Sequence, residues 1–597
     1  MASIDAATEP NTPPNFYTEL YRPQYHFSPP VGNLADPNGL VYFEGEYHLF
    51  YQQDGNWAHA VSRDLVHWEH LPIALAHDEL GQALSGSVVV DWADSSGLFG
   101  GKPGLVAVYT STKGGEAQSI AYSTDKGRTW KRYRGNPVIP NPGIKDFRDP
   151  KVFWHEDTGR WIMVVSTGNS VAFYRSHNLI DWEYSSSFGE GHGSHVAVWE
   201  CPDLFRLAVD GDPDRQKWVL HVSVGDNNVT NGSTAQYFVG EFDGVRFKND
   251  NPPETVLITD FGQDFYAAQS FSDIPPEDGR RIWLAWMANW RYPYQSPTLP
   301  WKGSMSIPRS LSLRTTEDGA IRLVQEPVVE LKTLRATEYK VESFLVDGEY
   351  EINDFHATTF EFELVMEWDE VEEAGIRVRA SQEEATVIGL ETTTNTIFVD
   401  RTKAGLEWLV DRHGTLFRFG RRYQASCRLD EKRIKLHGFV DESSIEVFAN
   451  DGEIVFSNLI YTRPTNRSVE LYSRGGSVHI IYLKLYHLRS IWRPWPSFDK
   501  LDYIVLSDEY LSLRVGETRE VQAAAKPDWI SGVDLLVWEV DDPGIAGLAA
   551  QTSGRAVLQG LQVGMTRLRV RARDAPVSAE IPVWVVGESE ERLEFAL

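Results

Sequence analysis

Three acidic residues stand beside prolines where an extended segment meets a turn, and together they could cleave a bond between two sugars. Proline fixes its own φ and moves the preceding residue out of the helical region, so such acids sit on rigid backbone. One carboxyl can protonate a leaving glycosidic oxygen while a second attacks the sugar or activates water. Asp-Pro is also common in plain turns. The three acids, Asp36, Asp149 and Glu200, occur in Asp36-Pro-Asn-Gly39, Phe147-Arg-Asp-Pro150 and Trp199-Glu-Cys-Pro-Asp203.

Sequence neighbours suggest different roles for two of these acids. Asp36 lies beside the amides of a strong Asn-Gly turn, so we expect it to stay ionised and to act as the nucleophile. Glu200 has aromatic and apolar neighbours in sequence, so we expect a raised pKa suited to a general acid.

Composition favours a β-rich chain that binds a neutral ligand. A length of 597 residues exceeds one hydrophobic core and predicts two or three domains. The 20 Trp and 24 Tyr suit both sheet packing and the apolar faces of sugars. A net charge of -28 argues against nucleic acid or an anionic membrane as partner. The only two cysteines, Cys201 and Cys427, predict neither a disulfide framework nor a metal site, and no cofactor is expected.

The beginning of the chain lacks the basic and apolar segments of a signal peptide, and no apolar run approaches the ~20 residues of a membrane span. We expect residues 1–19 to be a disordered leader. Two locations remain open: the cytoplasm, or an extracellular or cell-surface origin with the signal peptide replaced.

Residues 20–330 contain short alternating runs separated by turn residues, with a loose repeat every 50 to 65 residues. A repeat of this length fits one four-stranded sheet per unit, which predicts a five-bladed β-propeller. Acids from different blades then meet at the central axis. The repeated sequences are Ser62 to Trp68, Ser123 to Trp130, Ser176 to Trp182 and the weaker Phe242 to Phe247.

Two further all-β units follow the repeat. Residues 338–492 contain more alternating strands and predict a β-sandwich. Residues 503–587 resemble the bacterial immunoglobulin-like domains that are often appended to surface or secreted enzymes, which favours export.

Taken in order, the motifs resemble glycoside hydrolase family 32, which includes invertases, inulinases and levanases. The resemblance runs from about residue 21 to 313 and continues weakly through the sandwich. It rests on Tyr25-His-Phe27, Asp36-Pro-Asn-Gly39, His48 to Gln52, Ser62 to Trp68, Leu84 to Ser87, Phe147 to Pro150, Glu200-Cys-Pro-Asp203, Asp264 to Ser270 and, in the sandwich, Val440 to Phe448.

The resemblance implies a five-bladed propeller with a β-sandwich and retaining cleavage of β-fructofuranosides, without a metal or cofactor. By that resemblance Asp36 is the nucleophile, Glu200 the acid/base, and Asp149, with Arg148 beside it, the residue that stabilises the transition state. The implied substrate-binding residues, besides Arg148, are Asn38, Gln52, Trp57, Leu84, Ser85 and Trp290.

Two positions depart from the family pattern. Members usually have Trp-Met-Asn before the nucleophile, whereas this chain has Asn33-Leu34-Ala35, so the asparagine that normally touches the sugar is missing. The loop after Gln52 is also short, which predicts an open pocket mouth suited to polymeric fructan.

Three functions remain open at this point. The first is a hydrolase that removes fructose from levan, inulin or sucrose. The second is a fructosyltransferase that uses the same acids, and the third is a non-catalytic fructan-binding protein. The sequence leaves endo or exo attack, linkage preference and oligomeric state open, because rim loops and surfaces decide them.

Overall fold

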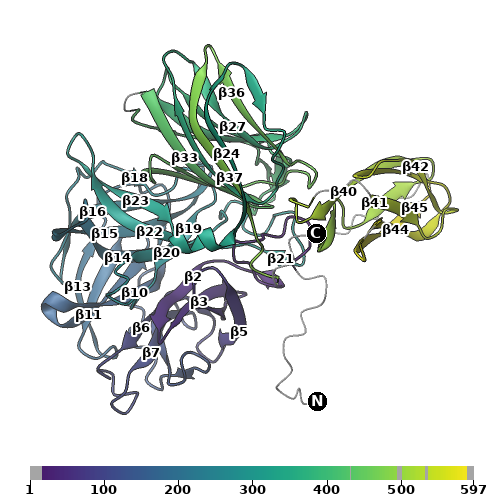
Figure 1. The fold of residues 1–597 in the computed structure, drawn as a ribbon. Coiled ribbons are helices and arrows are strands. Elements are labelled where there is room, and N and C mark those ends of the chain that lie inside the picture. The colour runs from purple at the N-terminus through teal and green to yellow at the C-terminus, as the bar shows by residue number, and fades with distance from the viewer. Residues whose placement is uncertain (1–16, 430–431, 494–499, 531–535, 574, 588–597) are drawn as a thin grey trace, which may run out of the picture.

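The computed structural model describes residues 17–429, 432–493, 500–530, 536–573 and 575–587. Most of the expected leader, residues 1–16, lies outside the described residues. Its last part is not disordered as predicted, because Tyr17 is buried and stacks on Trp492 with ring centroids 4.2 Å apart. Figure 1 shows three β-rich units in chain order, coloured from purple through green to yellow.

The first unit has five blades: three are separate four-stranded antiparallel sheets, and the last two are joined into one larger sheet by a parallel bridge between Val209 and Leu313. The first strand of each blade is the innermost. Blade one contains β2 (Pro37–Phe43), β3 (Glu46–Gln53), β4 (Asn56–Ser62) and β5 (Trp68–Leu75), and blade two contains β6 (Ala83–Asp91), β7 (Gly104–Ser111), β8 (Ala117–Ser123) and β9 (Lys131–Arg132). Blade three contains β10 (Phe147–His155), β11 (Arg160–Thr167), β12 (Val171–Ser176) and β13 (Trp182–Phe188), and blade four contains β14 (Trp199–Val209), β15 (Asp212–Asn227), β16 (Gly232–Phe242) and β17 (Phe247–Asn249), with β18 (Leu257–Ile258) beside β16. Blade five contains β19 (Tyr266–Ser270), β20 (Arg281–Trp286), β22 (Arg309–Thr315) and β23 (Ile321–Pro327).

The ring of blades closes between the last and the first. A parallel bridge joins Val41 of β2 to Ser272, just after β19. Short β1 (Gly32–Asn33) also pairs with β21 (Trp301–Lys302). Blade one is therefore fixed to blade five at two places, and the innermost strands surround one axis.

The repeated sequences form the turns between the third and fourth strands of the first three blades. In blade one, Ser62 Oγ donates to Asp64 Oδ1 at 3.1 Å, and that oxygen accepts the amides of Val66 and His67. Ser123 with Asp125 and Ser176 with Asn178 repeat the serine contact at 2.7 and 3.2 Å. The repeat therefore marks a side-chain-stabilised turn, and the blade assignment made from it is confirmed.

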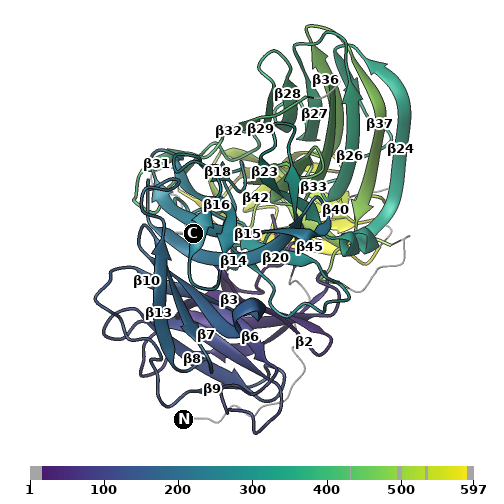
Figure 2. The same cartoon turned by 90° about the vertical axis from the view of Figure 1, so that its left-hand side faces the viewer.

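The second unit is a sandwich of two six-stranded sheets around one apolar core. One sheet contains β24 (Arg335–Val346), β37 (Val478–Leu488), β26 (Phe360–Glu367), β33 (Arg433–Val440), β34 (Ser444–Ala449) and β35 (Ile454–Leu459). The other contains β25 (Glu349–Glu351), β36 (Ser468–Arg474), β27 (Glu373–Ala380), β28 (Ala385–Glu391), β29 (Thr396–Lys403) and β32 (Arg422–Ser426). A separate hairpin, β30 (Trp408–Val410) and β31 (Leu416–Arg418), leaves the second sheet (Figure 2).

The third unit, yellow in Figure 1, has two four-stranded sheets packed around Trp538. They are β38 (Tyr503–Leu506), β40 (Thr518–Lys526), β43 (Arg555–Gly560) and β42 (Ala546–Gln551), and β39 (Leu511–Arg514), β45 (Ser578–Val586), β44 (Gly564–Ala572) and β41 (Leu536–Val540). The predicted all-β class, with a five-bladed propeller, a sandwich and a small C-terminal β-unit, is confirmed.

Helical structure is minor. The helical elements of the described residues are the 3-10 turns η1 (Glu156–Thr158) and η2 (Val329–Leu334). Across these same residues, no helix has the length and apolar character needed to cross a bilayer.

A buried ionic cluster joins the propeller to the sandwich. His26 lies between Asp441 and Glu446 of the sandwich, with nitrogen–oxygen distances of 2.8 and 2.9 Å. Arg309 of β22 also contacts Glu446 and lies 3.0 Å from Asp260. Since these side chains are almost completely buried, the cluster fixes the two units in one orientation.

Candidate active site

All five innermost strands bring side chains to the same end of the propeller axis. Asp36 directly precedes β2, and the other positions fall at the beginnings of their strands. The opposite ends of these strands line a separate cavity of about 890 Å³ that contains none of the three predicted acids. The side chains at the N-terminal mouth include Asp36, Ser85 (β6), Asp149 (β10), Glu200 (β14) and Tyr266 (β19).

A β-bulge interrupts each innermost strand next to its site residue. In blade three the register shifts between Arg148 and Lys151, and in blade four between Glu200 and Asp203. Asp149 and Cys201 adopt left-handed backbone, with φ of 65° and 47°. Proline follows both and cannot donate to the ladder, so the prolines seen in the sequence mark where the strands turn their side chains into the mouth. The shifts in the other three blades fall between Asn38 and Val41, Leu84 and Gly86, and Tyr266 and Gln269.

The two carboxylate oxygens of Asp36 differ in their hydrogen bonding. Ser85 Oγ donates to Oδ2 at 2.7 Å, whereas Oδ1 is buried and finds no hydrogen-bond partner among the described residues. Burial and the charge of Glu200 raise the pKa of Asp36 to about 6. Desolvation therefore outweighs the hydrogen bond from Ser85, although a carboxyl with this pKa is still mostly ionised at pH 7.

Glu200 is surrounded by polar groups, not by the apolar residues that its sequence neighbours suggested. Arg148 donates to Oε1 from Nε at 3.1 Å and from Nη2 at 2.7 Å. The Tyr266 hydroxyl donates to Oε2. Burial and the nearby Glu200 charge raise the pKa of Tyr266 well above its usual range, so the phenol stays protonated and can donate at any physiological pH.

Asp149 lies beside the other two acids and is linked to them through Cys201. The Cys201 amide donates to Asp149 Oδ2 at 2.9 Å, and its thiol lies 3.6 Å from the same oxygen and 3.7 Å from Asp36 Oδ2. Burial raises the pKa of Asp149 to about 7, with the charges of Glu200 and Asp36 adding to it and Arg148 opposing it. Cys201 is thus a buried residue that bridges two carboxylates.

Arg148 neutralises a cluster of acids that extends beyond the predicted ones. Its Nη1 lies 3.0 Å from Glu116 and 2.8 Å from Asp146, while its other nitrogens hold Glu200. Sequence analysis missed Glu116 and Asp146, although Asp146 stands only two residues before Arg148.

The polar residues expected in the pocket form a chain behind Asp36. With its amide oriented to satisfy both ends, Asn38 accepts from Gln52 Nε2 at 3.1 Å and donates to Ser85 Oγ at 3.2 Å. Gln52 Nε2 also donates to the Ala83 carbonyl at 3.0 Å. Asn38 is completely buried, so its predicted contact with substrate is wrong; it positions Ser85 instead.

Trp57 is likewise not a surface of the pocket. The side chain has 0% exposure within the apolar core between the first two blades, and its indole N–H donates to the Leu84 carbonyl at 2.9 Å. Trp57 therefore supports the partly exposed Leu84 from behind.

An aromatic group forms one side of the mouth. Trp290 is partly exposed, and its ring centroid lies 5.0 Å from that of Trp286 and 6.4 Å from that of Tyr266. Tyr294, which sequence analysis missed, is 37% exposed. Burial, together with the charges of Asp36 and Asp54, raises the pKa of Tyr294 to about 12. Trp290 therefore lies beside the Tyr266 that contacts Glu200.

The one group of ionisable side chains in the described structure that is close enough to hold a metal ion lies in the sandwich, away from these acids. It consists of Glu361, Glu363 and His437. Arg335 already donates to Glu361 at 2.7 Å and to Glu363 at 2.7 Å. Since the guanidinium occupies the carboxylates, the group is an ion-pair cluster of the sheet surface.

Comparisons with known proteins agree with this geometry. The family model "Glycosyl hydrolases family 32 N-terminal domain" matches residues 26–327, and "Glycosyl hydrolases family 32 C terminal" matches residues 330–487. A levanase of Bacillus subtilis (strain 168) is 47% identical over 83% of this chain and 73% of its own length. A levanase of Bacillus sp. (strain L7) is 45% identical over 87% of this chain, which spans 57% of that protein.

A fungal relative extends the comparison to a solved structure. An extracellular exo-inulinase of Aspergillus awamori is 35% identical over 80% of this chain and 96% of its own length. The crystal structure of exo-inulinase from the same species superposes with a TM-score of 0.73 at 34% identity, covering 80% of this chain and all of that one.

Proposed function

The chain belongs to glycosyl hydrolase family 32, and we propose on that premise that it is a β-fructofuranosidase that releases fructose from fructans and sucrose. The observation that carries the proposal is the meeting, at one end of the propeller axis, of Asp36 with a free buried oxygen and Glu200 held by Arg148 and Tyr266. A nucleophile and an acid/base are the two groups that a retaining glycosidase needs.

Each acid has a role in a double displacement. Asp36 Oδ1 attacks the anomeric carbon of the fructosyl unit while Glu200 protonates the leaving oxygen, and the bond to the leaving sugar breaks. Glu200 then takes a proton from water, whose oxygen attacks the same carbon and releases fructose from Asp36. Asp149 accepts hydrogen bonds from fructose hydroxyls, and Arg148 limits the repulsion among the acids.

Asp36 is suited to attack at neutral pH. With a pKa of about 6, most of it is ionised at pH 7, and its basicity is higher than that of an exposed aspartate. Ser85 orients the carboxylate so that Oδ1 is the oxygen presented to the sugar.

The short rim supports a preference for polymeric substrates. β3 and β4 are joined by a two-residue turn, Asp54 and Gly55, with φ of 51° and 75°. Such a turn adds no lid over the leaving-group side. We expect kcat/KM for levan or inulin, per chain end, to equal or exceed that for sucrose; a much higher value for sucrose would contradict this preference.

Action outside the cell fits the same substrates, since polymeric fructans are met there. An extracellular exo-inulinase among the relatives supports this location, as does the small C-terminal β-unit. Detection of the native protein in the culture medium or at the cell surface tests it.

Product chromatography with levan, inulin and sucrose tests the function. The wild-type protein should release free fructose from each, and Glu200→Ala should reduce the rate at least ~100-fold. Glu183→Ala is the matched control, because Glu183 lies on the outer strand of blade three with its side chain 75% exposed. Growing oligofructosides would instead indicate transfer, and the absence of any product from the wild type would indicate a binding protein.

A further inference from the structure

The hairpin β30–β31 of the sandwich reaches the propeller beside the candidate active site. Leu409 and Phe417 of the hairpin pack with Met287 and Tyr292 of the propeller in one apolar cluster. Met287 and Tyr292 flank Trp290 in sequence. The hairpin is therefore seated on the segment that carries the aromatic side of the mouth.

The turn at the tip of this hairpin has a defined shape. Asp411 Oδ1 accepts the amides of His413 and Thr415, each at 2.9 Å. The Arg412 amide donates to the Arg291 carbonyl at 3.0 Å. The turn is thus closed by its own aspartate and hydrogen-bonded to the residue that follows Trp290.

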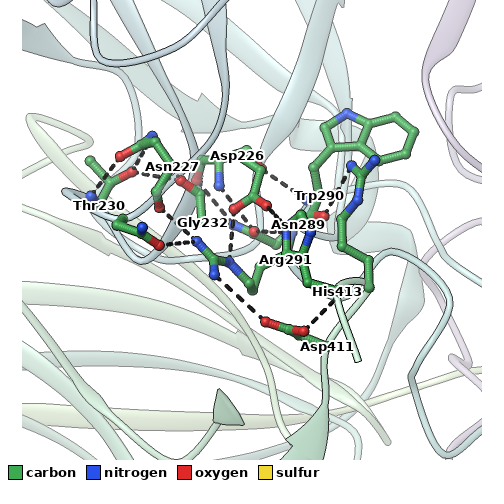
Figure 3. A network of polar contacts seen from close by, with 12 residues as sticks. Asp226, Asn227, Thr230, Gly232, Asn289, Trp290, Arg291, Asp411 and His413 are labelled. Atoms are coloured by element: carbon green, nitrogen blue, oxygen red, sulfur yellow. Dashed lines mark hydrogen bonds and ion pairs between the residues drawn. The ribbon is translucent and has the colours of Figure 1, made fainter. Parts of the chain in front are cut away.

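Charged side chains fix the same turn to blade four (Figure 3). Asp226 accepts from Arg291 Nε at 2.8 Å and lies 2.7 Å from His413 Nε2. Arg291 Nη1 lies 3.6 Å from Asp411. One aspartate of the propeller therefore holds both the segment carrying Trp290 and the tip of the sandwich hairpin.

Arg412, at the centre of this turn, presents an exposed guanidinium to the mouth. Its Cζ lies 5.4 Å from the ring centroid of Trp290, and Nη1 lies 3.4 Å from the Trp290 carbonyl. No carboxylate of the described residues lies within 4.0 Å of it. The guanidinium therefore lies over Trp290, the partly exposed aromatic residue at this side of the mouth.

The position of Arg412 relative to Glu200 determines which part of a substrate Arg412 can contact. Trp290 adjoins Tyr266, whose hydroxyl contacts the proposed acid/base. The acid/base faces the leaving oxygen, so groups beyond Tyr266 and Trp290 lie on the leaving-group side. A guanidinium there has several N–H donors available for sugar hydroxyls.

We propose that Arg412 of the sandwich hairpin binds the leaving-group sugars of a fructan, with Trp290 beneath its guanidinium. The inference rests on the proposed fructan hydrolysis and adds a specificity-determining residue from the second domain. The Asp226, Arg291, Asp411 and His413 contacts position Arg412, so the sandwich serves substrate binding as well as packing.

Two substrates that differ only beyond the scissile bond test this proposal. Methyl β-fructofuranoside has no leaving sugar, whereas a fructan trisaccharide has two. For Arg412→Ala we expect kcat/KM on the trisaccharide to fall about tenfold, as for a lost hydrogen bond from a charged donor, with less than about a twofold change on the methyl fructoside. Arg412→Lys, which keeps the charge but loses the planar fork, should fall in between.

The matched control is Arg418→Ala on the same hairpin. Arg418 faces Glu407 at 3.6 Å and the Trp408 ring, not Trp290, so both substrates should keep wild-type kinetics. Thermal unfolding of each variant separates lost binding from lost folding. An equal fall on both substrates, or none on the trisaccharide, would overturn the role of Arg412. If the wild-type protein hydrolyses neither substrate, the proposed function itself fails.

Discussion

The Ser85 hydroxyl lies 2.7 Å from Oδ2 of Asp36, on the carboxylate whose other oxygen is buried without a partner. Behind Ser85, Asn38 and Gln52 continue the chain of hydrogen bonds into blade one. The nucleophile is therefore oriented by its neighbours before substrate arrives. Such preorganisation fixes which oxygen reacts.

Replacing Ser85 with alanine should shift the acidic limb of the kcat/KM–pH profile to higher pH. The hydroxyl favours the charged form of Asp36, whose pKa is already raised to about 6 by burial, so its loss raises that pKa further. We expect the apparent pKa of kcat/KM to rise by about 1 unit. Ser186→Ala, which removes a hydroxyl from the outer strand of blade three, is the control. An unmoved limb would show that Ser85 does not control the charge of Asp36.

Asp36→Asn should stabilise the fold while abolishing activity. A carboxyl whose pKa rises from 3.8 to about 6 on folding destabilises the folded state once it is ionised. Stability is therefore lost as pH rises from about 4 to about 6, and the asparagine variant escapes this loss. Denaturant unfolding at pH 7 should show a gain of ~1–3 kcal/mol, discounted for the partial exposure of Asp36, and almost none at pH 4. A variant less stable than wild type at pH 7 would contradict the raised pKa.

Much of the site could be predicted because its signals are local. Prolines next to Asp36, Asp149 and Cys201 mark the bulges that turn side chains inward, and the serine-containing repeat marks the blades. The residues that contact each acid in space, in contrast, come from distant parts of the chain. Glu200 meets Arg148 and Tyr266 from other blades, so its surroundings could not be read from Trp199 and Cys201.

How deeply a side chain is buried within its blade could not be predicted from the sequence either. Asn38 and Trp57 follow the family pattern, yet both are completely buried and act through Ser85 and Leu84. Arg412 carries no motif and lies 122 residues after Trp290. It reaches the mouth because a hairpin of the sandwich folds back onto the propeller.

Ala35→Asn should change the kinetics on fructosides by restoring a polar group beside the nucleophile. Ala35 is buried directly before Asp36, and its amide donates to the Gln52 carbonyl at 3.0 Å. One neutral hydrogen bond to the sugar is worth about 0.5–1.5 kcal/mol, or about 2- to 13-fold in kcat or KM. Ala35→Leu adds similar volume without the amide and serves as the control. Identical kinetics of the wild type and the asparagine variant would contradict the prediction.

The ionic cluster between propeller and sandwich should also make the stability of the folded protein depend on pH. Burial disfavours a charge on His26, but hydrogen bonds and charges from Asp441 and Glu446 outweigh it and raise the pKa of His26 to about 9. The contribution of the charged imidazole is therefore complete below the unfolded pKa of about 6.5 and is lost as pH rises through about 9. The same two carboxylates have lowered pKa values.

His26→Ala should destabilise the protein by ~3–5 kcal/mol at pH 6, because it leaves two buried carboxylates without their shared cation. The difference in the free energy of unfolding between wild type and variant should narrow towards pH 9.5, since only the wild type loses stability as His26 deprotonates. Denaturant unfolding across this range measures it. His67→Ala is the control: His67 pairs with Asp64 on the surface, where an ion pair is worth ~0–1 kcal/mol. A gap that stays constant from pH 6 to 9.5 would mean that His26 is neutral in the folded protein, and that the two units are held together mainly by Arg309 and apolar packing.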